Sequence, residues 1–460
     1  MSFLETIPRL DAKGGREPEY GWGKAFKDSL PLQGCAVLVL DRSVPSTKHL
    51  KDELTLMGVS QFDVVTNPND FFRFVAERSY DFVFCDYNID ERRTGAVILE
   101  ELRTRQPANF TGSVVVLSGD RSAAALLSMM EQEPDTFLIK PFSAEELSRR
   151  IIRIHARRMV FRLAQKALNS KEYDVALAHC QEILRDFPHY DKEALKFMVD
   201  VYLAAQRLEQ ADTLLKQQAA VASPAWVDLY LGRLCRSRGE RSEAESWLRK
   251  AISTAPHYLI AQEELADLLV EAGRFEEALS MLDALPTFAI PPVRRLRRLS
   301  ELAELQGYDE RKKNYLNRLI EKSLGTTLVS ASDFYRLAQH YIEANRPDEA
   351  AKVLSRMRVV VDGSEAEMTE GMMLAYGHGL QGSTDLARQE LEAIAKKQIA
   401  KGIQLSIGGK IMFMMLCARL GLVKKAESLK LQLFKTVQDK ATLARIRRIE
   451  QRSLNNSGAA

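Results

Sequence analysis

The sequence predicts two kinds of fold in one chain: an α/β domain with a doubly wound, five-stranded parallel sheet and, after it, an all-α helical solenoid. Two observations predict this division. In the first third of the chain, short β-branched runs alternate with amphipathic stretches, which is typical of a parallel sheet with helices on both faces. After about residue 157 the strand-like runs stop, and apolar residues keep a helical spacing to about residue 452.

The α/β part contains five strand-and-helix units. Buried strands are predicted at residues 35–40, 62–66, 82–85, 113–118 and 136–139. Helices are predicted at residues 46–58, 69–79, 95–106, 123–133 and 144–158. Ligands of such sheets bind beyond the carboxyl ends of the strands, so the residues that follow each strand are candidates for a functional site.

Polar side chains stand at the ends of four of these strands. Asp41 ends the first strand, Asp86 the third and Ser118 the fourth, and the fifth strand runs into Lys140. These groups can hold a phosphoryl group. One carboxylate can act as the nucleophile and another can hold a divalent cation, while the hydroxyl and the ammonium bind phosphoryl oxygens.

The order and spacing of these residues resemble the receiver domain of two-component response regulators, over about residues 35–155. The resemblance implies that Asp86 is the phosphoacceptor. It also implies that Mg²⁺ is held by Asp41, by Asp86 and by the backbone carbonyl of Asn88.

The same resemblance assigns roles to residues near the last two strands. Ser118 would bind the phosphoryl group, and Phe137 stands where the family has its switch aromatic. Lys140 matches the invariant lysine of the family, and the peptide bond between it and Pro141 is expected to be cis.

Two departures from the family pattern concern the metal site. Arg42 stands where the family has a second acid, and the loop after Asp86 is one residue longer than usual. One acid fewer predicts weaker Mg²⁺ binding, unless Asp90 or Glu91 compensates. Alternatively, the Arg42 guanidinium could lie over Asp86 and replace the cation. The sequence therefore leaves two interpretations open, a phosphorylatable receiver and a degenerate one.

An alanine-centred phrase recurs in the helical part, at Ala176, Ala211, Ala244 and Ala278. The intervals are 35, 33 and 34 residues. This period predicts helix–turn–helix units with alanine where two helices approach closely. The unit is similar to the tetratricopeptide repeat, a family of 34-residue helical pairs.

These patterns divide the chain into six segments. They are a flexible N-terminal arm at 1–33, the receiver-like domain at 34–156, about four repeats at 157–285, a degenerate helical segment at 286–330 where Lys312 replaces the expected alanine, further repeats at 331–452 and a flexible tail at 453–460.

The solenoid is expected to bind a peptide or protein segment in a groove lined by the first helix of each pair. The candidate groove residues lie at repeat positions that need not pack, and they are Lys196, Asp200, Trp226, Arg233, Arg236, Glu263 and Asp267. Trp226 is the predicted anchor, because aromatic residues and arginines carry most interface energy. The alternative is that Trp226 packs against the neighbouring repeat.

Composition excludes several classes of protein. The 460 residues include 65 Lys plus Arg and 62 Asp plus Glu, a balance that does not by itself indicate a nucleic-acid or membrane surface. No apolar stretch reaches the ~20 residues that span a bilayer. Five dispersed cysteines and no secretory signal favour the cytoplasm. No output-enzyme motif is evident, so no enzymatic activity is expected.

Together these patterns predict a response regulator of a two-component phosphorelay with a protein-binding solenoid. A histidine kinase or phosphotransfer protein would act upstream, and phosphorylation at Asp86 would control binding of an unidentified protein partner. One alternative is a scaffold with a degenerate receiver that works without phosphorylation. Another is a nucleic-acid-binding regulator using the basic helices around residues 150 and 294–298, although they lack interleaved aromatics and a known nucleic-acid-binding motif.

Overall fold

The computed structural model describes residues 31–89, 93–105, 112–120, 122, 132–221, 224–285 and 291–457. The chain divides into two compact units, Met1–Ala261 and Gln262–Ala460, and each is treated separately. Most of the predicted N-terminal arm, the predicted helix at 123–133 apart from its last two residues, and the last residues of the predicted tail lie outside the described residues. Asp90 and Glu91 lie outside them as well.

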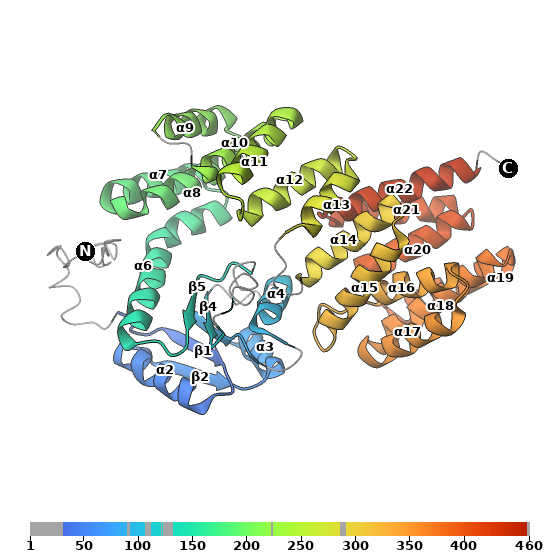
Figure 1. Ribbon diagram of the computed structural model, residues 1–460, viewed down its shortest axis with the longest axis horizontal. Coiled ribbons are helices and arrows are strands. Elements are labelled where there is room, and N and C mark those ends of the chain that lie inside the picture. The colour runs from blue at the N-terminus through green and yellow to red at the C-terminus, as the bar shows by residue number, and fades with distance from the viewer. Residues whose placement is uncertain are drawn as a thin grey trace. The chain divides into compact units, whose positions relative to one another are not determined.

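The first unit begins with the predicted sheet (Figure 1). Its strands are β1 (Ala36–Leu40), β2 (Gln61–Val65), β3 (Phe82–Asp86), β4 (Ser113–Ser118) and β5 (Thr136–Ile139). All pairs are parallel and the spatial order is β2-β1-β3-β4-β5. This is the doubly wound topology that the sequence predicts, and its chain reversal next to β1 places the ends of β1 and β3 side by side.

Helices cover both faces of this sheet because side chains alternate along each strand. Val37 and Val39 of β1 pack on one side with α2 (Val44–Leu56) and the start of α6 (Ala144–Asn169). Leu38 and Leu40 pack on the other side with α3 (Pro68–Glu77) and α4 (Gly95–Arg105). The sheet is therefore packed between two apolar cores, and these fix the positions of the strand ends at its carboxyl edge.

Helix α6 belongs to both folds of the first unit. The Ser143 hydroxyl caps its start by accepting a hydrogen bond from the amide of Glu146. Ile151, in the first half of the helix, lies in the core of the sheet, whereas Ala164 in the second half packs against the next helix. The 26 residues contain no glycine or proline, so one uninterrupted helix joins the sheet to the solenoid.

The helices that follow in the first unit form antiparallel pairs. They are α7 (Tyr173–Asp186), α8 (Asp191–Ala204), α9 (Leu208–Val221), α10 (Ala225–Arg238) and α11 (Arg241–Thr254). The predicted contact alanines Ala176, Ala211 and Ala244 are fully buried. A Cβ atom added at Gly232 would lie 3.0 Å from the Leu248 side chain, so the small residue is needed where α10 crosses α11.

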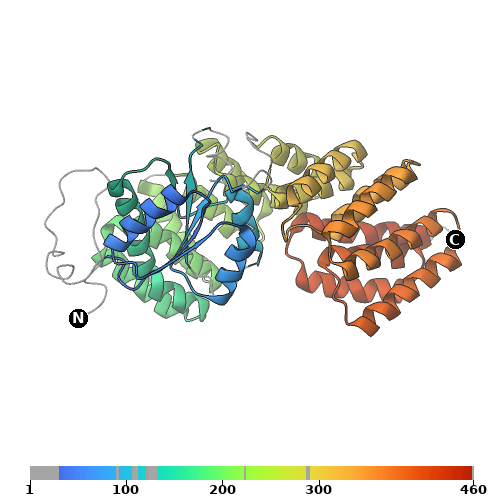
Figure 2. The same ribbon diagram turned by 90° about the horizontal axis from the view of Figure 1, so that it is seen from below.

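The second unit continues the series of helical pairs (Figure 2). Its helices, with α12 starting at the unit boundary, are α12 (Leu259–Glu271), α13 (Phe275–Asp283), α14 (Val293–Gln306), α15 (Asp309–Ser323), α16 (Ala331–Glu343), α17 (Pro347–Val360), α18 (Gly363–Leu380), α19 (Thr384–Lys401), α20 (Ile407–Arg419), α21 (Val423–Thr436) and α22 (Lys440–Ser457). Within the predicted degenerate segment, α14 and α15 form a regular pair. Lys312, in place of the alanine, is buried and forms an ion pair with Asp309 at 3.2 Å.

Candidate functional site at the carboxyl edge of the sheet

Lys140 joins the two acids at the carboxyl edge of the sheet. Its ammonium nitrogen lies 2.7 Å from Oδ2 of Asp41 and 2.9 Å from Oδ1 of Asp86. Asp41 is only 2% exposed, while the side chain of Asp86 remains 14% exposed. The structure therefore brings together three residues that are far apart in sequence, and it leaves Asp86 as the acid that solvent can reach.

Asp41 and Asp86 differ in how they are held. The other carboxylate oxygen of Asp41, Oδ1, accepts a hydrogen bond of 2.7 Å from the amide of Ser43, which fixes the side chain at the start of α2. Burial raises the pKa of Asp86; the neighbouring Asp41 charge acts in the same direction, while Lys140 opposes both. With two acids and one lysine, this site has one more negative charge than positive charges.

Ser118 lies at the end of β4, fully buried. Its hydroxyl donates to the carbonyl of Asp120 and accepts from the amide of the same residue, both at 3.0 Å. Its own carbonyl accepts from the amide of Lys140 at 2.7 Å, which ties the ends of β4 and β5 together. The Ser118 hydroxyl thus lies near the carboxyl edge of the sheet, and its two hydrogen bonds are made within the loop that follows β4.

Phe137 is half-buried on β5, among Tyr87, Ala96 and Val116. The Arg150 guanidinium of α6 lies 5.8 Å from its ring centroid and donates a 3.0 Å hydrogen bond to its carbonyl oxygen. The predicted switch aromatic is therefore in contact with the helix that leads into the solenoid. The peptide bond between Lys140 and Pro141 is cis, as the resemblance implies.

Gly95 is a site residue that the sequence analysis did not single out. A Cβ atom there would lie 2.7 Å from the carbonyl oxygen of Asp86, and the Gly95 amide donates to the Tyr87 carbonyl at 2.7 Å. Only glycine allows α4 to begin this close to the end of β3. A glycine opening a helix soon after a strand-end acid is the signal that could have identified it.

The loop that follows Asp86 carries Asn88, which is exposed and bridges to Thr94. Arg42 is also exposed, and its Nε donates a 3.2 Å hydrogen bond to the carbonyl of Thr66. The structure thus gives Arg42 a different partner from the predicted one. Lys140, not Arg42, is the cation that contacts Asp86 in the part of the chain that the structure describes.

Oxygen atoms dominate this edge, which fits a hard cation such as Mg²⁺. The available donors are the Asp86 carboxylate and the Asn88 carbonyl, with Asp41 beside them, although both oxygens of Asp41 already have hydrogen-bond partners. The donor set therefore fits Mg²⁺. It offers fewer free carboxylate oxygens than a site in which neither acid had a hydrogen-bond partner.

The predicted groove residues of the first unit contact one another. Trp226 is 7% exposed and packs edge-on against Tyr230 in the core between α8 and α10, with the Lys196 ammonium 5.6 Å from its ring. The prediction that Trp226 is an accessible anchor is wrong, and the alternative, packing against the neighbouring repeat, is correct. Its large apolar ring gains more from burial between two helices than from exposure.

The remaining groove candidates also have partners within the fold. Asp200 accepts a 3.0 Å hydrogen bond from the Tyr230 hydroxyl and lies 3.8 Å from Arg233, which also stacks over Tyr230. Arg236 is half-buried. Two further pairs lie in the second unit, Glu263 with Arg294 and Asp267 with Arg298. These residues are half-buried and take part in contacts within the fold, and their role in a binding groove stays a prediction.

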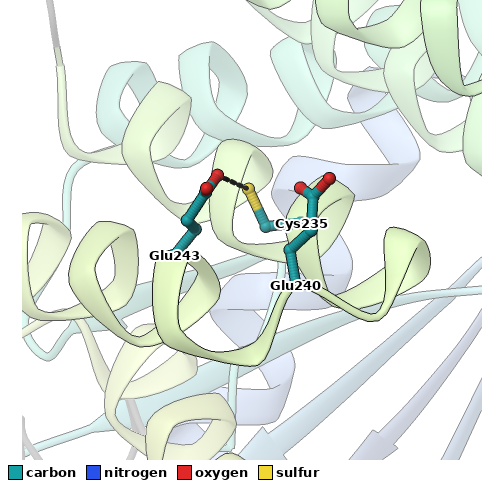
Figure 3. Close-up of side chains that lie close together, drawn as sticks. All are labelled: Cys235, Glu240 and Glu243. Atoms are coloured by element: carbon teal, nitrogen blue, oxygen red, sulfur yellow. Dashed lines mark hydrogen bonds between the residues drawn. The ribbon is translucent and has the colours of Figure 1, made fainter.

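One other group of side chains has ligand-type atoms close together (Figure 3). Cys235 at the end of α10 points toward Glu243 of α11, with Sγ 4.0 Å from Oε2, and Glu240 lies beside them. Burial raises the pKa of the Cys235 thiol to about 11, and the two glutamates add to this. The thiol is therefore neutral at pH 7, and exposed acids such as Glu240 and Glu243 are common on protein surfaces without a metal ion.

The sheet and its edge define a receiver-type domain, and the helical pairs define a repeat solenoid. Residues 37–152 match the family model of the response regulator receiver domain, and residues 236–289 match that of a tetratricopeptide repeat. The chain therefore contains a response regulator receiver domain followed by tetratricopeptide repeats. No curated protein matches it. Among the described residues, no helix has the length and apolar character that crossing a membrane requires.

Solved structures resemble parts of the chain. The receiver domain of a histidine kinase from Arabidopsis thaliana, complexed with Mg²⁺ and BeF₃⁻, is 24% identical, with coverage of 27% of this chain and 92% of its own and a TM-score of 0.25. The C-terminal part of a tetratricopeptide protein from Cytophaga hutchinsonii is 12% identical, with coverage of 62% and 98% and a TM-score of 0.36. PilF of Pseudomonas aeruginosa is 16% identical, with coverage of 53% and 90% and a TM-score of 0.30.

Proposed function

We propose that the protein is a cytoplasmic response regulator in which a phosphoryl group on Asp86 controls binding of a protein partner by the repeats. The observation that carries this proposal is the position of Lys140, within 2.9 Å of a solvent-accessible Asp86 and within 2.7 Å of a buried Asp41. The excess negative charge and the open face of Asp86 suit an incoming phosphoryl group accompanied by a cation. The output is binding rather than catalysis.

In the proposed reaction, a carboxylate oxygen of Asp86 attacks the phosphorus of the donor, and the bond from phosphorus to the donor's leaving atom breaks. Lys140 would then move from Asp86 to an oxygen of the new phosphoryl group, because its flexible ammonium already lies at the acid. Mg²⁺ would be held by Asp86, the Asn88 carbonyl and Asp41, and it would offset the charge of the phosphoryl oxygens.

Phe137 and α6 offer a route from Asp86 to the repeats. If the Ser118 hydroxyl turns from Asp120 to the phosphoryl group, the end of β4 shifts, and Phe137 packs beside Val116 of that strand. Arg150 of α6 holds the backbone of Phe137 by a 3.0 Å hydrogen bond. A movement of Phe137 would therefore act on α6, whose second half packs in the first repeat.

Acetyl phosphate with Mg²⁺, followed by intact-mass measurement of the full chain, tests the chemistry. We expect one added phosphoryl group on the wild type and none on Asp86→Asn, whereas Asp52→Asn, on the exposed face of α2, should behave as the wild type. A folded wild-type chain that gains no mass over a wide Mg²⁺ range would leave the degenerate-receiver scaffold as the function. Hydrogen exchange in α6 and α7 before and after phosphorylation then tests the route to the repeats.

A histidine kinase or phosphotransfer protein is the proposed source of the phosphoryl group in the cell. The scaffold remains the second candidate because Arg42 occupies the position of an acid at the metal site. A pull-down with wild type against Asp86→Asn separates the two functions, because a constitutive scaffold would capture the same partner with both chains.

A further inference from the structure

Helix α22 does not simply cover the last helical pair. It packs against α20 of the pair just before it and also against α14, which opens the fourth pair before it (Figure 1). Two hydrogen bonds between α14 and α22 join residues 141 positions apart. A helix that only sealed the end of a solenoid would contact the final pair alone. The C-terminal helix therefore lies along a face that the earlier pairs of the second unit provide.

Among the described side chains, three contacts join polar groups of α22 to acids of the earlier pairs. The Lys440 ammonium lies 2.8 Å from Glu271 of α12. The Thr442 hydroxyl donates a 2.9 Å hydrogen bond to Glu301 of α14, and Arg445 Nε donates a 2.9 Å hydrogen bond to Glu304 of α14. The described contacts thus pair an acidic surface with a basic helix.

Two of these charged side chains are buried in the intact chain. Glu301 and Arg445 are each 4% exposed. Arg336 of α16 holds the other oxygen of Glu304 by a 3.0 Å hydrogen bond and donates a second one, of 2.8 Å, to Ser300. Arg336 therefore holds one carboxylate oxygen of Glu304, and the other oxygen is left to bind Arg445 of α22. Without α22, Glu304 would keep Arg336 but lose Arg445, and Glu301 would lose its hydrogen bond from Thr442. The negative charge of α14 would then be less well balanced.

Apolar packing supplies the rest of the contact. Ile446 is fully buried among Ile411 and Met414 of α20 and Leu433 of α21. Methionine side chains adapt to differently shaped apolar partners, and this suits a surface that can exchange one helix for another. We define the α22 site as Glu271, Glu301, Glu304, Ile411 and Met414.

We propose that the α22 site binds a basic amphipathic helix of a partner protein and that α22 occupies this site as an internal ligand. The chemistry of the partner follows from α22, which carries Lys440, Arg445, Arg447 and Arg448 and has no acid between residues 440 and 448. A partner helix would place one lysine or arginine on Glu271 and a second, about five positions along, on Glu304. An aliphatic residue next to the second base would pack on α20. This inference goes beyond the proposed function, and it does not depend on phosphorylation of Asp86.

The test uses the full chain and a labelled peptide with the sequence of residues 439–457. In the wild type, α22 competes with the peptide, so binding should be weak. In the double variant Lys440→Ala/Arg445→Ala, both basic contacts of α22 are lost while all three acids remain. The weakened α22 should compete less, so the peptide should bind at least about tenfold more tightly. Adding Glu304→Gln should reverse this gain. The control is Lys396→Ala/Lys424→Ala, which removes two exposed positive charges elsewhere in the second unit and should behave as the wild type.

A second measurement avoids any substitution. Excess peptide added to the wild-type chain should accelerate hydrogen exchange in α22 and leave exchange in α16 and α18 unchanged. The proposal is overturned if the peptide leaves α22 exchange unchanged at saturating concentration. It is also overturned if the folded double variant releases α22 but binds the peptide no better than the wild type does, because α22 would then be a structural cap on a surface without ligand-binding capacity.

Discussion

Two groups of buried charges differ in one respect that bears on function. The edge cluster of the receiver, Asp41, Asp86 and Lys140, has two acids for one base. The α14 cluster, Glu301, Glu304, Arg336 and Arg445, has two of each, and α22 supplies one of the two bases. A cluster with an excess acid is suited to binding a further cation, whereas the α14 cluster already has its counter-charge in α22.

The largest effect is expected when the base of the edge cluster is removed. Lys140→Met would leave the buried Asp41 and the partly buried Asp86 facing each other, and should lower the free energy of unfolding of the receiver by about 3 kcal/mol. Native-state hydrogen exchange of the five strands measures this. Lys48→Met, at an exposed position on α2, is the control. An unchanged exchange pattern would mean that Lys140 does not balance the two acids.

Arg445→Ala makes the equivalent change in the α14 cluster. It removes a charged hydrogen bond to Glu304 but leaves Arg336 there, so the expected loss is smaller, about 2 kcal/mol in the free energy of opening α22. Hydrogen exchange in α22 reports it. The exposed Lys424→Ala variant, on α21, should change this value by less than about 0.5 kcal/mol. Equal effects of the two variants would contradict the described pairing.

Arg42→Asp adds a third acid to the edge cluster and sharpens its imbalance. It also removes a positive charge that repels a cation, so Mg²⁺ should bind about tenfold more tightly. Titration calorimetry with Mg²⁺ measures the change. Lys166→Asp makes the same charge change on the exposed face of α6 and should leave the affinity as it is in the wild type. No gain in Arg42→Asp would place residue 42 outside the metal site.

The smallest expected effect concerns pH. Burial raises the pKa of Glu301 to about 7, with the Asp439 charge adding to this and Arg336 and Arg445 opposing it. When α22 is released from α14, Glu301 becomes solvated and its pKa falls. The closed state, with α22 packed on α14, therefore binds one proton more than the open state. The closed state is therefore favoured at pH 6, and opening should become easier by about 1 kcal/mol between pH 6 and pH 8.

Hydrogen exchange of α22, corrected for intrinsic rates, checks this pH dependence. Glu304 should not contribute in this range, because its pKa is lowered to about 2 by Arg445 and Arg336, which outweigh its burial. Glu301→Gln should make the opening free energy independent of pH between pH 6 and pH 8. A slope that survives this substitution would have to come from another group.

The edge cluster could be predicted from the sequence because its geometry follows from a general rule. Parallel strands end at a common edge, so the residues after them, Asp41, Asp86 and Lys140, had to converge once the strands were identified. The orientation of individual side chains did not follow. Arg42 could reach either Asp86 or the Thr66 carbonyl. The choice depends on where β2, which pairs with β1, places the carbonyl of Thr66.

The packing of Trp226 and the position of α22 were not accessible from local patterns. Repeat numbering identifies which helix faces point the same way, but whether Trp226 is covered depends on the side chains of α8 and on Tyr230. The contact between α22 and α14 depends on how much each intervening pair turns the solenoid. Such accumulated rotation has no signature in any single 34-residue window.

The continuous α6 imposes a constraint on chain length. At 1.5 Å per residue its 26 residues form a rod about 39 Å long, so a tilt of about 5° at the Phe137 end would displace the other end by about 3 Å. The same rigidity fixes rotational phase. One residue inserted into α6 would turn the first repeat by about 100° around the helix axis relative to the sheet. A receiver could therefore be exchanged between such chains only if the lengths of their α6 helices differ by whole helical turns.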